Sequence, residues 1–176
     1  MNSMQITFGR KFPNKYLTTL MFTPKGYGYL EWIRAETSFS YVAIRKQVME
    51  LLDLGEEKLP VTTRCRCGSH PTRIGFIVDS SGIGFHQLYC ENCCPRKPDF
   101  KEKIVDLKFS SVNSFSKKSD QGVFLRNLKC LLGVPRVDNE KADAIFSQIE
   151  KEQQAVAKAD DLKNSVLKGQ MVFSFA

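Results

Sequence analysis

The sequence predicts an α+β fold, with a small N-terminal helical module, a central β-hairpin and C-terminal helices. Residues 74–78 and 84–89 are rich in β-branched and aromatic side chains, and residues 79–82, Asp-Ser-Ser-Gly, have the composition of a turn. Residues 38–52 and 139–168 instead carry apolar side chains at helical spacing. A hairpin pattern between two helical patterns is what predicts this fold class.

Four of the six cysteines lie in two close pairs, one at each end of the predicted hairpin. Cys65 and Cys67 precede the hairpin, and Cys90 and Cys93 follow it. Closing the hairpin brings the pairs together, so that four thiolates can surround one Zn²⁺ ion in a tetrahedron. This layout resembles a zinc ribbon, and we expect one structural zinc.

Other interpretations of the cysteines stay open. His70 or Cys94 can replace one of the four ligands, or the cysteines can form two disulfides or remain free and buried. Disulfides need an oxidising compartment, and residues 1–7 lack the apolar core of a signal peptide, so we expect a cytoplasmic protein. Cys130 follows a leucine-rich run and is expected to be an inert buried thiol.

The charge of the chain is positive and unevenly distributed. There are 26 Lys and Arg against 19 Asp and Glu, for a net charge of +7. Residues 61–110 contain 8 basic and 5 acidic side chains, residues 111–137 contain 5 and 1, and residues 138–176 contain 5 and 7. A basic middle suggests a polyanionic partner, although a solvated basic surface without a ligand has the same composition. No apolar run approaches the ~20 residues of a membrane helix, so we expect no membrane partner.

The first 52 residues contain two short motifs. Phe8-Gly9-Arg10 begins a basic loop with Lys11 and Lys15, and residues 29–33 read Tyr-Leu-Glu-Trp-Ile before a predicted helix. These motifs resemble the module at the C-terminus of exonuclease X-like 3′–5′ exonucleases, which also occurs in small stand-alone phage and bacterial proteins. The loop is longer here and has Asn14 where that family has glycine.

The acidic exonuclease domain of that family has no counterpart in this sequence. The resemblance therefore implies an accessory role in nucleic-acid metabolism and no exonuclease activity. We expect Phe8, Leu30 and Trp32 in the core, and we expect the cations of the loop to contact nucleic acid.

The sequence pattern predicts three helices and one further strand, and it indicates where the helices begin and end. Ser38 or Ser40 is expected to cap the first helix and Gly55 to end it. A strand is expected within residues 100–109, a short helix over 123–132, and a long helix that Asp138 caps and Gly169 ends.

We divide the chain into an N-terminal module at 1–58, a zinc-ribbon domain at 59–109, a Ser/Lys-rich mobile loop at 110–122 and a helical segment at 123–176.

Cations and aromatic side chains flank the cysteine pairs. Phosphates attract the cations and unpaired bases stack on aromatic rings, so this combination is typical of single-strand binding. Phe76 is expected to cover the zinc site from within. The nucleic-acid candidates, added to Arg10, Lys11 and Lys15, are Arg64, Arg66, Arg73, Phe85, Tyr89, Arg96 and Lys97.

We therefore expect a zinc-containing nucleic-acid-binding accessory protein of replication, recombination, repair or transcription, with DNA favoured over RNA. It can equally be phage-encoded and act in the host cytoplasm. The first alternative is a protein-interaction adaptor whose basic surface contacts an acidic protein.

The second alternative is a degenerate His-Asn-His nuclease, since residues 87–97 are similar to the cysteine-containing half of such sites. The metal-activating histidine is missing: Asp79 is followed by Ser80, and Cys94 stands at the histidine position. His86 could act only as a lone base. We expect no enzymatic activity.

The C-terminal end is unusually apolar. Chain ends are normally polar, so Val172, Phe173 and Phe175 need a surface that covers them. One expectation is a final β-strand in the protein's own core. The other is an extended docking peptide, because Gln170 followed by two phenylalanines resembles the peptides that bind sliding clamps.

Overall fold

The computed structural model describes residues 5–6, 11–36, 38 and 41–173, with side chains up to residue 160. Helices precede and follow a small antiparallel sheet in the described chain, which confirms the predicted α+β class. The elements are α1 (Leu17–Leu20), α2 (Pro24–Ala35), α3 (Val42–Leu54), β1 (Arg73–Asp79), β2 (Gly82–Tyr89), β3 (Glu102–Asp106), the 3₁₀ helix η1 (Phe109–Ser114), α4 (Lys118–Leu131) and α5 (Asn139–Phe173).

The sheet has the strand order β2-β1-β3 and is antiparallel throughout. The predicted hairpin is confirmed, with Asp79 opposite Gly82 at the turn. Ile74 pairs with Leu88 on one side and with Val105 on the other, so three buried aliphatic side chains meet in one row. A register shift between Gly75 and Phe76 interrupts the β1–β2 pairing, as a β-bulge does.

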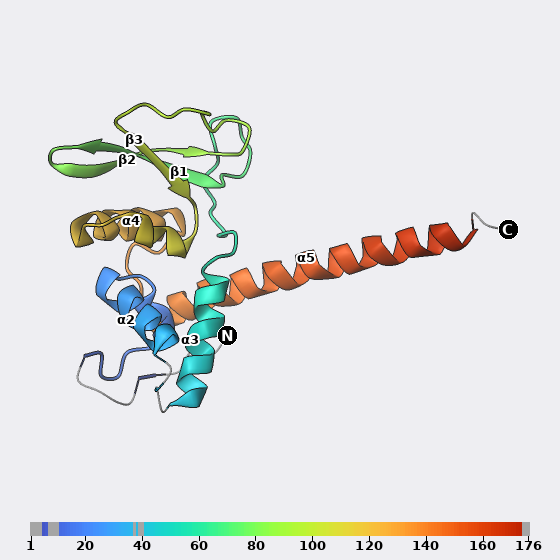
Figure 1. Cartoon of the computed structure of the whole chain (residues 1–176), viewed down its shortest axis with the longest axis horizontal. Helices are drawn as coiled ribbons and strands as arrows, with labels where there is room; N and C mark the ends of the chain where they lie inside the picture. The colour runs from blue at the N-terminus through green and yellow to red at the C-terminus, as the bar shows by residue number, and fades with distance from the viewer. Residues whose placement is uncertain (1–4, 7–10, 37, 39–40, 174–176) are drawn as a thin grey trace.

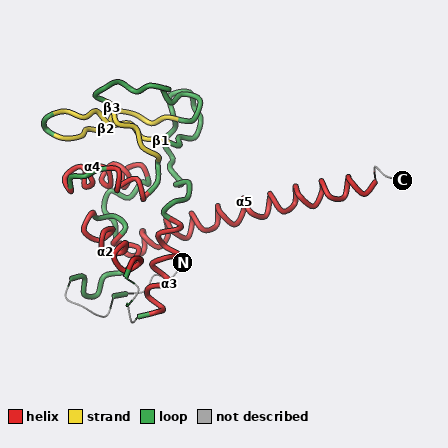
Figure 2. Tube along the Cα trace, in the orientation of Figure 1, coloured by secondary structure: helices red, strands yellow, loops and turns green. Residues whose placement is uncertain are grey.

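One face of the sheet packs on α4, which separates the sheet from the N-terminal helices (Figures 1 and 2). Phe76 has no exposed surface, which confirms its predicted burial, while the predicted cover over the metal site stays a prediction. Its ring meets Phe115 edge-on at 5.5 Å between centroids and lies 6.1 Å from the ring of Phe124. These three rings join the sheet to η1 and α4.

A second aromatic cluster lies inside the helical part of the molecule. Phe109 and Phe146 stack at 5.3 Å, and Phe22 meets Phe109 edge-on at 5.1 Å. The three side chains come from η1, the start of α5 and the segment after α1, and all are buried. Long-range packing of this kind holds residues from both ends of the chain in one hydrophobic core.

The start of α3 differs from the prediction. Its N-cap is Tyr41, whose side chain makes no capping hydrogen bond, so the expected serine cap is wrong. Ser38 instead bonds the carboxylate of Glu36, and Ser40 lies outside the described residues. The C-terminal prediction is confirmed, because Gly55 caps the helix and donates its N–H to the carbonyl of Leu51.

Residues 110–122 are not the expected mobile loop, since they form η1 and the first turn of α4. Val112 and Phe115 are buried, and the buried amide of Gln121 donates to the carbonyl oxygen of Phe115 at 2.8 Å. The apolar residues Val112 and Phe115 are hard to recognise as core residues in the sequence, because serine and lysine residues surround them. Further along α4, the Cys130 side chain is exposed, so the expectation of a buried thiol is also wrong.

Helix α5 has 35 residues, which makes it about 52 Å long. Asp138 caps it as predicted, accepting the N–H of Lys141 at 2.9 Å. Apolar residues at positions 142, 145, 146, 149 and 156 lie at helical spacing in the sequence and predict one apolar face. Ala142, Ile145, Phe146 and Ile149 are buried, which confirms that face, whereas Val156 is 63% exposed and does not belong to the core.

The second half of α5 leaves the body of the molecule and projects alone (Figure 1). Gly169 does not end the helix, which continues to Phe173. The expected final strand is therefore wrong, because Gln170, Val172 and Phe173 are helical, and Phe175 lies outside the described residues. None of the helices in the described part of the chain combines the length and apolar character that a membrane crossing needs.

Candidate metal centre

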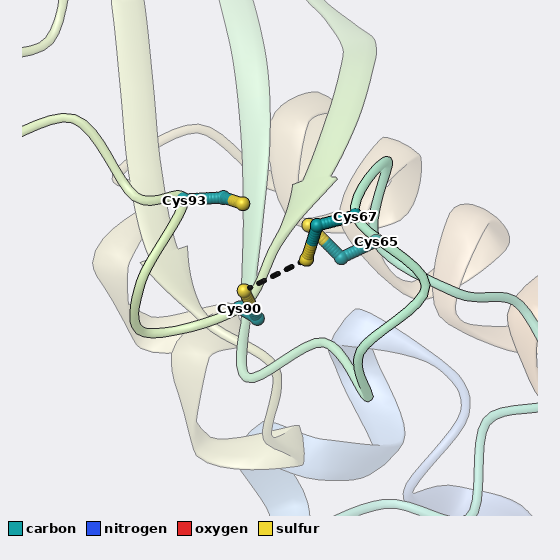
Figure 3. Close-up of side chains that lie close together, drawn as sticks. All are labelled: Cys65, Cys67, Cys90 and Cys93. Carbon is teal, nitrogen blue, oxygen red and sulfur yellow. Dashed lines mark hydrogen bonds between the residues drawn. The ribbon is translucent and has the colours of Figure 1, made fainter.

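Four cysteine sulfurs converge where the hairpin is furthest from its turn. The Sγ atoms of Cys65, Cys67, Cys90 and Cys93 all lie within 4.8 Å of one another, and those of Cys67 and Cys90 are 3.4 Å apart (Figure 3). Zinc–sulfur bonds of about 2.3 Å in a tetrahedron place the sulfurs about 3.8 Å apart. The cluster therefore has the donor set and size of a four-cysteine metal site, compatible with zinc.

The first pair is held by a tight turn. The N–H of Gly68 donates to the carbonyl of Cys65 at 2.8 Å, and the N–H of Cys65 donates to the carbonyl of Ser69 at 3.0 Å. Gly68 has φ +86°, a left-handed conformation that costs little without a Cβ atom. This turn points two alternate cysteines toward the same space.

The second pair follows β2 directly. The N–H groups of Cys93 and Cys94 both donate to the carbonyl of Cys90, at 3.2 and 3.0 Å, so the chain turns sharply there. The N–H of Thr72 also donates to the carbonyl of Tyr89 at 2.8 Å. That bond ties the residues beside the two pairs together, so the hairpin itself fixes the distance between them.

The four sulfurs differ in exposure and acidity. Cys65 and Cys90 are buried, whereas Cys67 and Cys93 are exposed. Hydrogen bonds from Ser69 lower the pKa of Cys67 to about 6. The neighbouring sulfurs of Cys67 and Cys90 raise the pKa of Cys93 to about 12. Adjacent thiolates repel one another, so full ionisation of this cluster requires a cation at its centre.

The two alternative ligands lie outside the four-sulfur cluster. His70 Nδ1 is 2.8 Å from the carbonyl oxygen of Pro71. Cys94 accepts a hydrogen bond from the guanidinium of Arg73 at 3.2 Å. The arrangement therefore favours the predicted set over substitution by either residue.

The cations near the centre differ in their surroundings. Arg66, Arg96 and Lys97 are exposed, as a ligand-binding role requires. Arg73 is instead engaged by Cys94 and by Asp106, 3.5 Å from its Nε atom. Arg64 lines a groove together with the acidic residues Glu152 and Asp160 of α5. Positive charge is thus partly compensated on this side of the molecule.

The two aromatic candidates for base stacking, Phe85 and Tyr89, differ in their exposure. Phe85 is 46% exposed, so its ring can accept a base. Tyr89 is only 5% exposed and therefore cannot act as a stacking surface. Its hydroxyl donates to Glu102 at 2.5 Å, and burial, followed by this contact, raises the pKa of Tyr89.

The pairing of Tyr89 with Glu102 gives Gly75 a role that the sequence did not suggest. A Cβ atom on Gly75 would lie 2.7 Å from Glu102 Oε1 and 2.9 Å from Tyr89 Cε2. Glycine is thus required for these side chains to meet across β1. Only the strand register, which places Gly75 between Gln87 and Ile104, reveals this arrangement.

The N-terminal cations occupy a different part of the structure. Lys11 and Lys15 are exposed and precede α1, while Arg10 and Phe8 lie outside the described residues. In Figure 1 the chain before α1 lies at the opposite end of the body from the loops that carry the cysteines. Leu30 is buried as expected, but Trp32 is 49% exposed, so its assignment to the core is wrong.

Compared with models of known families, with curated proteins and with solved structures, the chain matches none. The resemblances to the exonuclease X-like module and to zinc ribbons therefore stay predictions.

Proposed function

We propose that this chain is a zinc-stabilised nucleic-acid-binding protein, an accessory factor in replication, recombination, repair or transcription. The observation that carries the proposal is a four-cysteine centre beside the exposed cations Arg66, Arg96 and Lys97. A metal ion with four protein ligands stabilises the fold. The cations then supply sequence-independent attraction to phosphates.

The metal centre has a structural role in this proposal. A catalytic zinc keeps one position open for water, whereas four cysteine ligands fill the tetrahedron. His86 lies near Glu102, with 3.9 Å between Nε2 and Oε1, and is not among the residues of the cysteine cluster. We therefore propose binding without cleavage.

The test measures metal content and binding on the same purified protein. Native mass spectrometry should find one zinc ion per chain, and the affinity for a labelled oligonucleotide should fall steeply with salt. The expected slope of log affinity against log salt is about 0.7 to 0.9 per phosphate contacted. Salt-independent binding, or binding that is absent, would refute the proposal, and cleavage of the oligonucleotide in magnesium would reassign the class.

A second candidate is a protein-interaction adaptor, favoured by the projecting half of α5. Residues 151–160 are all exposed, and the helix continues to Phe173 without a neighbouring element in Figure 1. A sliding clamp or another replication protein is the proposed partner of the C-terminal end. Removing residues 170–176 should abolish binding to a purified clamp and leave oligonucleotide affinity unchanged.

A further inference from the structure

A groove lies between the N-terminal segment and the end of α4, two regions separated by more than a hundred residues. Its volume is about 460 Å³, and its cationic lining consists of Lys15, Lys129 and Arg136. Phe12, Leu20 and Val137 contribute apolar lining. We call this the basic groove. The sequence gives no indication that these segments meet.

Backbone turns and hydrogen bonds position the chain segments that carry the three cations. Asn14 adopts a left-handed φ of 58°, and the N–H of Ile6 donates to the carbonyl of Lys15 at 2.8 Å. At the other side, Gly133 has φ 72°, and the N–H of Val134 donates to the carbonyl of Lys129 at 2.8 Å. This αL cap turns the chain so that Arg136 faces the same groove as Lys15.

No acidic side chain is found among the described residues that line the basic groove. Nor do the ion pairs among the described residues include Lys15, Lys129 or Arg136. Arg73, in contrast, pairs with Asp106, and Arg64 lines a groove that also contains acidic side chains. Like charges gathered without counter-charges raise the local concentration of anions.

A connected row of aromatic rings extends from the groove. Phe12 lines it, and its ring is 5.1 Å from that of Tyr29. The Tyr29 ring is nearly parallel to the indole of Trp32, at 5.5 Å and 18°. Lys11 Nζ lies 5.7 Å from the centre of the Tyr29 ring. Trp32 belongs to this row and is 49% exposed, although a tryptophan is normally much more buried.

We infer that the basic groove and Trp32 bind single-stranded nucleic acid, with phosphates at the three cations and a base stacked at the indole. The inference rests on the proposed function and specifies its surface. Cations beside aromatic faces suit single strands, because the bases of a duplex are already stacked on one another. This surface adds a base-stacking site to the phosphate attraction that the cations around the cysteines supply.

Trp32 is the only tryptophan of the chain, so intrinsic tryptophan fluorescence reports on this site alone. The purified full chain is titrated with oligo-dT, with oligo-U and with a duplex of equal length. We expect saturable quenching by one or both single strands. The two single-stranded arms distinguish DNA from RNA as the natural ligand.

Variants then locate the binding site. Trp32→Ala should weaken single-strand binding about fivefold to 150-fold, and Trp32→Phe should restore most of the affinity. Phe100→Ala is the matched control, since Phe100 is a 91% exposed aromatic residue outside the proposed binding surfaces. Lys129→Ala with Arg136→Ala should lower the salt slope by about 1.4. Lys151→Ala with Lys158→Ala, which removes equal charge from exposed positions of α5, should not.

Anisotropy of a labelled oligonucleotide separates failure of this inference from failure of the proposed function. Salt-dependent binding that leaves Trp32 fluorescence unchanged overturns the inference alone. So does binding that Arg96→Ala with Lys97→Ala weakens while the substitutions in the basic groove do not. Preference for the duplex also overturns it. Absence of binding to every oligonucleotide overturns both.

Discussion

The sheet and the helical body are stabilised in different ways. The helical body buries large side chains from both ends of the chain, including Phe22, Phe109 and Phe146. The three-stranded sheet has one apolar face, which packs on α4, while its other face carries polar pairs such as Arg73–Asp106. At the end of the sheet that carries the cysteine pairs, Cys67 and Cys93 are exposed, so apolar burial is incomplete there. Metal binding at the four clustered cysteines, as we propose, would stabilise the part of the sheet that the hydrophobic core does not reach.

The largest effect should follow removal of the metal. Zinc sites of this kind contribute on the order of 10 to 16 kcal/mol in isolated zinc-finger peptides, so a strong chelator or Cys90→Ser should unfold the cysteine loops and the hairpin end. Hydrogen exchange should show loss of protection around residues 64–95 and continued protection in α3 and the start of α5.

Cys130→Ser provides the matched control, because it removes an exposed thiol that is not among the four clustered cysteines. It should leave metal content and exchange unchanged. If the hairpin stays protected after complete metal removal, the sheet does not depend on the metal and the comparison fails.

The second effect concerns the helical body. Phe146 has no exposed surface and stacks on Phe109, so Phe146→Ala should lower the free energy of unfolding by about 3–5 kcal/mol. Chemical denaturation monitored by circular dichroism measures this change. Phe100→Ala is the control, since Phe100 is 91% exposed and should contribute little.

The metal content of the folded Phe146→Ala protein should stay at that of the wild type. A variant that loses its metal together with its helical stability would show that the two regions are one cooperative unit.

Local patterns in the sequence were sufficient to predict the hairpin and the four-cysteine cluster. Turn composition at residues 79–82 and the position of the cysteine pairs next to the strands determine both features. Asp138 was predictable for the same reason, because a capping side chain acts on the N–H groups that follow it. Signals that operate within a few residues can be read without the tertiary structure.

Features that depend on tertiary contacts were predicted poorly. Trp32 has an apolar neighbourhood in the sequence, but α2 turns it outward while Tyr29 and Leu30 face inward. Residues 110–122 are polar on average, yet Val112 and Phe115 find partners on the sheet and α4. The basic groove could not be predicted from the sequence, because Lys15 and Arg136 come together only in the folded chain.

Gly68 and Gly84 provide the most local test of the region around the cysteines, and the expected effect is the smallest of those predicted. Gly68 has φ +86°, and nothing lies within 4 Å of an added Cβ atom, so only backbone strain opposes Gly68→Ala. That strain costs about 1 kcal/mol and should weaken metal binding roughly fivefold, measured by competition with a chromophoric chelator. Gly84 in β2 has equally open space and no left-handed backbone, so Gly84→Ala should leave metal affinity unchanged. Both variants should retain the unfolding free energy of the helical body. Equal metal affinities for the two variants would mean that the conformation of the first cysteine turn does not contribute to metal binding.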